Sequence, residues 1–153
     1  MTDINHTTKP FSFTEDELRQ SIELIFYAYR DFTAEPDAIL AEYGFGRAHH
    51  RVIYFVGRNP GINVSELLFI LRITKQSLSR VLSQLVKENF IMQRQGSRDR
   101  RQRLLELTEK GEDLERRLTQ TQREIVARAY LAAGEEAVKG YHAVLRGIIN
   151  KGK

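Results

Sequence analysis

Apolar residues recur along residues 74–87 with the period of a helix, and polar residues fill the positions between them, which predicts an amphipathic helix. The apolar residues recur at every third or fourth position and so share one buried face; they are Leu78, Val81, Leu82, Leu85 and Val86. The opposite face is polar and carries Gln76, Arg80, Ser83, Gln84 and Lys87, with Ser77 and Ser79 on its flanks. These groups can donate hydrogen bonds to phosphates or read base edges from a rigid element that fits a major groove.

A second short helix is predicted directly before this one, over residues 64–71. Asn63 can cap its first free amides, with Glu66 at the third position, and Thr74 can cap the following helix. Arg72 and Ile73 leave only a tight connection between the two helices. Two short helices joined by a turn of about three residues form a helix-turn-helix unit. Just upstream, Ile62 and Val64 are candidates for a short strand.

A β-hairpin with a basic tip is predicted after the second helix. Residues 91–95 and 103–107 have the composition of strands, and the loop between them holds four arginines and one carboxylate, in the order Gly96-Ser97-Arg98-Asp99-Arg100-Arg101-Gln102-Arg103. Arginine suits such a wing because its planar fork can bridge phosphate oxygens or enter a narrow minor groove. Asp99 has two possible roles. It can cap the loop amides, or it can orient Arg101 or Arg80.

Long apolar stripes at both ends of the chain predict further helices. One helix begins near Phe13, is capped by Thr14 with Glu17, and is expected to end before Pro36. A short helical piece over residues 37–43 and a helix over 47–58 follow. A long helix begins after Thr108 and is interrupted at Gly134.

These stripes divide the chain into regions with different expected roles. Residues 1–12 are expected to be a flexible arm, and residues 37–107 a winged helix-turn-helix lobe. Residues 13–36 and 108–150 carry more apolar helix surface than is needed to pack against a lobe of about sixty residues. We therefore expect them to form a dimerisation region. The alternative is a bundle within one chain.

Composition narrows the possible functions. The 153 residues carry a net charge of +4, and the basic residues gather between Arg94 and Arg103. The absence of cysteine excludes disulfides and thiolate metal sites, and no apolar run is long enough for a signal peptide or membrane span. We therefore expect a cytoplasmic protein without a membrane association.

No enzyme or metal chemistry is predicted. The sequence has no nucleophile and base at suggestive spacing, no phosphate-binding glycine loop, and no paired carboxylates in an apolar context. His49 and His50 are adjacent, so on a helix they point roughly 100° apart and cannot easily share one ion. We expect neither a cofactor nor a metal.

Four motifs resemble the MarR family of bacterial transcriptional regulators, over about residues 15–150. They are residues 61–68, the helix 74–89, Asp99-Arg100-Arg101, and Leu107-Thr108-Glu109-Lys110-Gly111. The resemblance implies a homodimer with intertwined terminal helices, a recognition helix in the major groove and a wing arginine in the minor groove. By that match Arg101 is the minor-groove arginine and Asp99 its orienting partner. The base- and phosphate-facing positions are then Lys75, Gln76, Ser77, Ser79 and Arg80.

The resemblance also implies a small aromatic or anionic effector, bound between the dimer helices and the DNA-binding lobe. Polar-tipped residues that can line such a site are Tyr27, Arg30, His49 and Tyr54. The alternative is that these are ordinary core or interface residues.

Together these observations predict a mainly α fold with a small β-hairpin wing, that is, a winged helix-turn-helix with N- and C-terminal dimerisation helices. The expected function is sequence-specific binding of double-stranded DNA by a homodimeric transcriptional regulator on a pseudo-palindromic operator. Repression and release by an effector follow only from the resemblance. The expected DNA contacts are Lys75, Gln76, Ser77, Ser79, Arg80, Arg98, Asp99, Arg100 and Arg101. The alternative function is a winged-helix module that docks an acidic protein.

Overall fold

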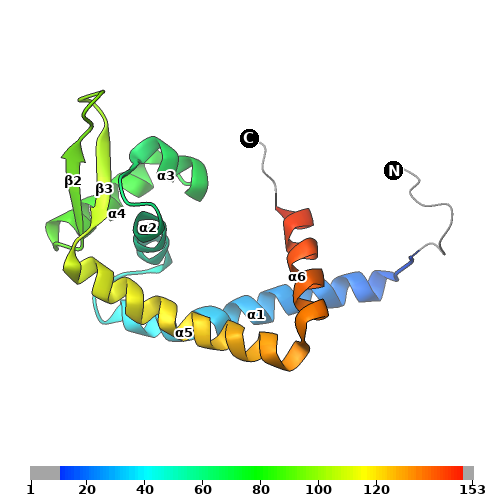
Figure 1. Cartoon of the computed structure of the whole chain (residues 1–153). Helices are drawn as coiled ribbons and strands as arrows, with labels where there is room; N and C mark the ends of the chain where they lie inside the picture. The colour runs from blue at the N-terminus through cyan, green and yellow to red at the C-terminus, as the bar shows by residue number, and fades with distance from the viewer. Residues whose placement is uncertain (1–10, 150–153) are drawn as a thin grey trace. The chain divides into compact units, whose positions relative to one another are not determined.

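The computed structural model describes residues 11–149, which form six helices and a small sheet (Figure 1). Most of the arm expected over residues 1–12, and residue 150 of the expected dimerisation region, lie outside the described residues. The described part of the chain divides into two compact units, and the boundary between Thr33 and Ala34 falls within the first helix. The prediction of a mainly helical fold with a small β wing is confirmed.

The first helix, α1, runs as one element over Glu15–Ala41, so the predicted end before Pro36 is wrong. Its start is as expected, because Thr14 Oγ1 accepts from the Glu17 amide and Glu17 accepts from the Thr14 amide. Proline inside a helix costs about 3 kcal/mol. Pro36 and Leu40 are buried, and full burial of one leucine alone is worth about 1.5–3 kcal/mol, which offsets much of that cost. The helical piece expected over 37–43 is therefore largely the end of α1.

Three further helices build the lobe: α2 (Arg47–Arg58), α3 (Val64–Leu71) and α4 (Lys75–Lys87). The predicted caps are present, since Asn63 accepts from the Glu66 amide and Thr74 from the Ser77 amide. Each helix turns one apolar face to a shared core. Its fully buried members include Val52, Ile53, Val56, Leu67, Leu78 and Leu85.

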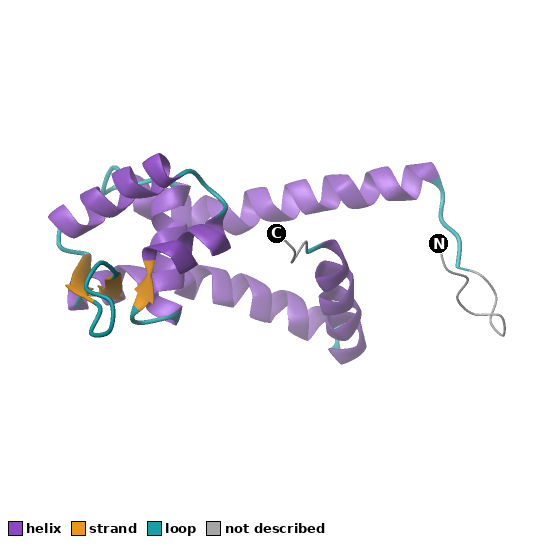
Figure 2. Ribbon diagram, turned by 90° about the horizontal axis from the view of Figure 1, so that it is seen from above, coloured by secondary structure: helices purple, strands orange, loops and turns teal. Residues whose placement is uncertain are grey.

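The sheet has three strands in the order β1-β3-β2, shown in orange in Figure 2. The hairpin strands β2 (Ile91–Gln95) and β3 (Arg103–Leu107) have the predicted bounds. The third strand, β1, covers only Ile62–Asn63 and pairs Ile62 with Leu105. Val64, which the sequence suggested for this strand, instead begins α3, because Asn63 caps that helix. The wing is thus anchored to the helix-turn-helix at its base.

Two helices complete the fold: α5 (Glu109–Ala133) and α6 (Glu135–Ile148). Thr108 caps α5 through the Gly111 amide, and Gly134, at φ 95°, separates the two helices as expected. Leu114 and Leu118 lie in the core of the lobe. The first turns of α5 therefore stabilise the lobe, although they belong to the region that the sequence assigned to dimerisation.

Candidate nucleic-acid interface

Helix α4 exposes a polar surface along its N-terminal half. Leu78, Val81, Leu82 and Leu85 are buried on the core side, whereas Lys75, Gln76, Ser79 and Arg80 are exposed. Among the residues that the structure describes, Lys75 and Arg80 have no hydrogen-bond or ion-pair partner. Their charges are therefore available to a partner such as the DNA backbone.

Ser77 differs from its neighbours because it takes part in the cap of α4. Its amide donates to Thr74 Oγ1 at 3.0 Å, and its hydroxyl oxygen accepts from the Thr74 hydroxyl at 3.0 Å. The residue is half-buried. One lone pair and the hydroxyl hydrogen of Ser77 remain for a contact outside the chain.

Gln84 does not face outward, contrary to the helical pattern. Its side-chain oxygen lies 2.8 Å from His49 Nε2, and its amide nitrogen donates to Glu88 at 3.2 Å. His49 Nδ1 accepts from the Gly46 amide, so the ring proton sits on Nε2 and is donated to Gln84. The chain of hydrogen bonds ties the second half of α4 to α2. No periodicity in the sequence marks this contact, because it joins residues 35 positions apart.

At the tip of the wing, Asp99 binds Arg101. One carboxylate oxygen of Asp99 accepts from the Arg101 amide at 3.0 Å and from Arg101 Nε at 3.2 Å. These two hydrogen bonds lower the pKa of Asp99 below its ordinary value, and the bond from the backbone amide has the larger effect. Asp99 therefore has both of the roles foreseen for it, with Arg101 rather than Arg80 as its partner.

The Arg101 side chain is 91% exposed although Asp99 holds its Nε, so its terminal nitrogens project from the loop into solvent. The guanidinium groups of Arg98 and Arg100 are also exposed, and within residues 11–149 neither has a hydrogen-bond or ion-pair partner. Arg103 is different, because it donates to Gln93 across the two strands at 3.0 Å. Three of the four loop arginines are thus presented at the tip, and one braces the hairpin.

The four effector candidates lie in different parts of the chain. Tyr27 and Arg30 belong to the N-terminal unit, where the guanidinium lies 4.9 Å from the tyrosine ring and also binds Asp31 at 2.8 Å. In the lobe, both ring nitrogens of His49 are hydrogen-bonded, and Tyr54 packs edge-to-face on Phe55. Each candidate thus has a contact within its own unit.

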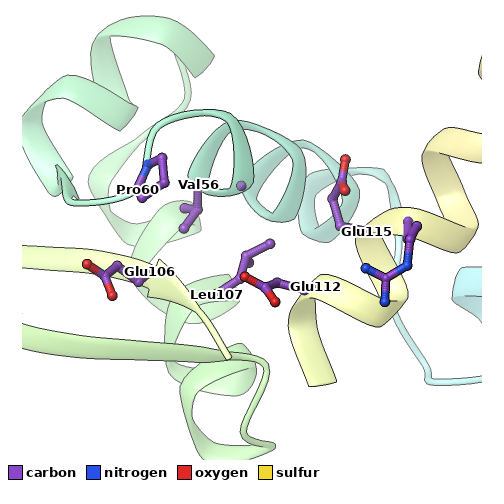
Figure 3. A pocket seen from close by; sticks show the side chains of 8 residues that line it. Val56, Pro60, Glu106, Leu107, Glu112 and Glu115 are labelled. Atoms are coloured by element: carbon purple, nitrogen blue, oxygen red, sulfur yellow. The ribbon is translucent and has the colours of Figure 1, made fainter. Parts of the chain in front are cut away.

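A pocket of about 530 Å³ lies between α2, β3 and the start of α5 (Figure 3). Its lining contains three carboxylates, on Glu106, Glu112 and Glu115, and one guanidinium, on Arg116. None of the four effector candidates lines it. The surplus of negative charge disfavours an anionic molecule here.

Two features that would point to other functions are absent from residues 11–149. No group of three or more side chains of the metal-binding types comes together there. No helix of this part of the chain is both long and apolar enough to cross a bilayer.

A helix-turn-helix with an exposed polar recognition face, followed by a wing that presents arginines, defines the winged-helix class of DNA-binding regulators. The sequence model of the MarR family matches residues 43–102. The chain is also 49% identical, over 137 residues, to the HTH-type transcriptional regulator PetP of Rhodobacter capsulatus, covering 90% of this chain and 82% of that protein. The chain belongs to the MarR family and is a DNA-binding transcriptional regulator.

Solved structures show the same fold. FabT of Streptococcus pneumoniae, solved in complex with DNA, superposes with a TM-score of 0.75 at 18% identity, over 86% of this chain and 94% of that one. A MarR family regulator of Listeria monocytogenes, complexed with a 26mer DNA, gives a TM-score of 0.70 at 23% identity, over 83% and 85%. The resemblance noted from the sequence is therefore confirmed.

Proposed function

We propose that a homodimer of this chain represses transcription by binding a pseudo-palindromic operator through α4 and the wing. The observation that carries the proposal is the Asp99–Arg101 pair, which presents an exposed guanidinium at the tip of a braced hairpin. A surface arginine held by a carboxylate loses less side-chain entropy when it binds. That is the property expected of a residue that must enter a narrow, electronegative groove.

Within this proposal, α4 and the wing contact different parts of the duplex. The exposed side chains of Gln76, Ser79 and Arg80 reach base edges in the major groove, with Lys75 and Ser77 on the phosphates beside them. In the wing, Arg98 and Arg100 bind phosphates and Arg101 enters the minor groove. Asp99 belongs to the proposed interface because it orients Arg101, rather than by pairing with phosphate, whose negative charge repels a carboxylate.

The proposed dimer rests on apolar side chains that the single chain leaves exposed. On α1, Ile22, Ile25, Phe26 and Tyr29 form a stripe at helical spacing. On α6, Tyr141, Val144 and Ile148 do the same. Large exposed apolar patches of this kind mark interaction surfaces. A twofold dimer presents two recognition helices about one turn of DNA apart, and so selects an inverted repeat.

The first test selects bound fragments from random duplex DNA, which should recover an inverted repeat. Binding to the recovered site should weaken steeply with salt, because phosphate contacts release counterions. The Arg101→Ala variant should bind about tenfold more weakly, a loss on the order of 1.4 kcal/mol. Affinity is measured by fluorescence anisotropy between about 50 and 200 mM salt.

The matched control is Arg116→Ala, which removes an exposed arginine of α5 outside the proposed interface. It should change affinity by less than about twofold. Affinity independent of salt, or equal losses in the two variants, would contradict the proposed interface. Repression is tested separately by transcription in vitro from a promoter that overlaps the recovered site; increased transcript would show activation instead.

We also propose that a small aromatic or anionic effector releases the DNA, with Tyr27, Arg30, His49 and Tyr54 as the candidate contacts. A ligand can do so only if it binds the DNA-free arrangement more tightly than the bound one. The test titrates the protein–DNA complex with benzoate, a generic aromatic anion, at constant ionic strength. Release that Arg30→Gln reduces would support the proposal, and no release at millimolar benzoate would count against an effector of this class.

A further inference from the structure

Arg72 adopts a backbone conformation that side chains other than glycine rarely take. It follows α3 as the C-cap residue, with φ 53° and ψ 44°, in the left-handed region. Its amide donates to the Leu68 carbonyl at 2.9 Å, which closes the last turn of α3. The left-handed conformation brings the β-carbon close to the neighbouring carbonyl oxygen, so glycine is the residue that usually ends a helix in this way.

The only other residue besides glycine that has a positive φ among residues 11–149 is Asn89, at 68°. Asparagine tolerates this conformation because its short polar side chain can bond the local backbone. Arginine is not among the residue types that routinely adopt this conformation. A strained backbone that persists in spite of a better local choice is a reason to look for a function of the side chain.

The position of Arg72 suggests that function. The residue forms the turn of the helix-turn-helix, two positions before Thr74, which caps α4. In this motif the N-terminal residues of the second helix contact the bases while the first helix crosses the backbone. The turn between them therefore lies at the edge of the major groove, beside the phosphates. Arg72 is exposed there, in the same stretch of chain as the exposed Lys75.

We propose that Arg72 contacts a DNA phosphate from the turn of the helix-turn-helix, once in each protomer. The inference rests on the proposed function, because it needs the N-terminus of α4 to enter the major groove. The contact is with the backbone, so Arg72 contributes affinity and fixes the register of α4 without reading sequence. Neither hydrophobic periodicity nor the charge cluster at the wing marks this residue, because the signal lies in its backbone angles.

The proposal is tested with three substitutions in the full-length chain. Arg72→Gly and Arg72→Asn both suit the left-handed conformation but remove the charge, whereas Arg72→Lys keeps the charge. Asn89→Gly is the matched control, since it changes the other left-handed position without changing charge. Each variant is measured for its melting temperature and for its affinity for the selected duplex, and a scrambled duplex, over a range of salt.

A phosphate contact and a structural role predict opposite results. The slope of log affinity against log salt should become shallower by about 0.9 for each lost contact, or about 1.8 for the dimer, in the glycine and asparagine variants. Affinity should fall by a similar factor on both duplexes, about tenfold at low salt. The melting temperature should not fall, because both residues relieve backbone strain. The lysine variant and Asn89→Gly should keep the wild-type slope.

Four results would overturn the inference. They are an unchanged slope in the glycine and asparagine variants, an equally shallow slope in the lysine variant, an equally shallow slope in Asn89→Gly, and a melting temperature that falls with affinity. The first three leave the proposed function intact if the wild-type chain still binds the selected duplex with a steep slope. Failure of the wild-type chain to bind any duplex would instead overturn the proposed function, and this inference with it.

Discussion

Gly111 and Gly140 both lie within helices, but only the surroundings of Gly140 leave space for a side chain. A β-carbon at Gly111 would lie 2.1 Å from the Phe90 carbonyl oxygen, whereas one at Gly140 would meet nothing within 4 Å. Gly111 also supplies the amide that Thr108 caps. The start of α5 can therefore approach the turn between α4 and β2 closely only because residue 111 has no side chain.

We expect Gly111→Ala to lower the free energy of unfolding by about 3 kcal/mol, because the backbone must move to admit the methyl group. Gly140→Ala should raise it by about 0.5–1 kcal/mol, since alanine is the better residue in an open helix. Urea denaturation at one fixed protein concentration gives both values. Similar effects of the two substitutions would contradict the close approach at Gly111.

The stabilisation of the wing by the Asp99–Arg101 pair depends on pH, and the lowered pKa of Asp99 sets the direction of that dependence. Because hydrogen bonds from Arg101 lower the pKa of Asp99, the ionised carboxylate stabilises the wing at all pH values above the ordinary range near 4. That stabilisation is lost only as the pH falls through the lowered value. Carbon-13 NMR titration of the Asp99 carboxyl should therefore give a midpoint below that of an unpaired aspartate.

Two variants separate the causes of this shift. Arg101→Ala should raise the pKa of Asp99 only part of the way, because the backbone amide of residue 101, the larger cause, is kept. Arg98→Ala should leave the pKa unchanged, because Arg98 has no part in the shift. An ordinary midpoint in the wild-type chain would show that the pair does not form in solution.

At the scale of elements, the sequence predicted best those features whose causes lie within a few residues. Thr14, Asn63 and Thr74 cap helices as expected, because capping involves an oxygen and an amide about three positions apart, and Thr108 caps the helix that was expected to begin after it. The two hairpin strands were also predicted correctly, because they pair across a short loop. The continuation of α1 through Pro36 was not predicted, because it depends on burial against residues distant in the sequence.

At the candidate interface, too, the features predicted from the sequence have local causes. The exposure of Lys75 and Arg80 follows from the helical period of α4, and that of Arg101 follows from its place in the hairpin loop. The inward orientation of Gln84 depends on His49 from another helix, and the left-handed turn at Arg72 requires backbone angles. Such contacts arise from the tertiary fold, which sequence patterns do not specify at the level of single side chains.

The cap of the recognition helix is a feature of the element whose loss should be measurable. Thr74→Ala should lower the free energy of unfolding by about 1 kcal/mol, because the amide of Ser77 loses its acceptor. It should also weaken DNA binding, since the first turn of α4 carries Lys75 and Gln76. Chemical denaturation and fluorescence anisotropy measure the two effects.

Thr74→Ser is the control, because it keeps the hydroxyl and should retain most of both properties. A serine variant as unstable as the alanine variant would show that the methyl group of Thr74 matters more than its oxygen. Equal stability of all three proteins would mean that the cap does not contribute.

At the scale of the whole molecule, the central prediction concerns the dimer. In a twofold interface each substitution occurs twice, so a single charged residue places two carboxylates among apolar groups. Phe26→Glu, in the exposed stripe of α1, should therefore weaken self-association by at least about a hundredfold, or on the order of 3 kcal/mol. Sedimentation at micromolar concentration should show single chains where the wild type is dimeric.

The matched control is Phe69→Glu, because Phe69 is 63% exposed and Phe26 is 62% exposed, but Phe69 lies on α3 outside the terminal helices. It should remain dimeric. If the two recognition helices act together, the Phe26→Glu chain should bind the full operator more weakly than the wild type. A duplex with a single half-site should bind the Phe26→Glu chain and the wild type equally well, because each lobe is intact. A Phe26→Glu chain that stays dimeric would place the interface elsewhere. One that is monomeric but binds the full operator undiminished would show that pairing of the lobes contributes nothing to recognition.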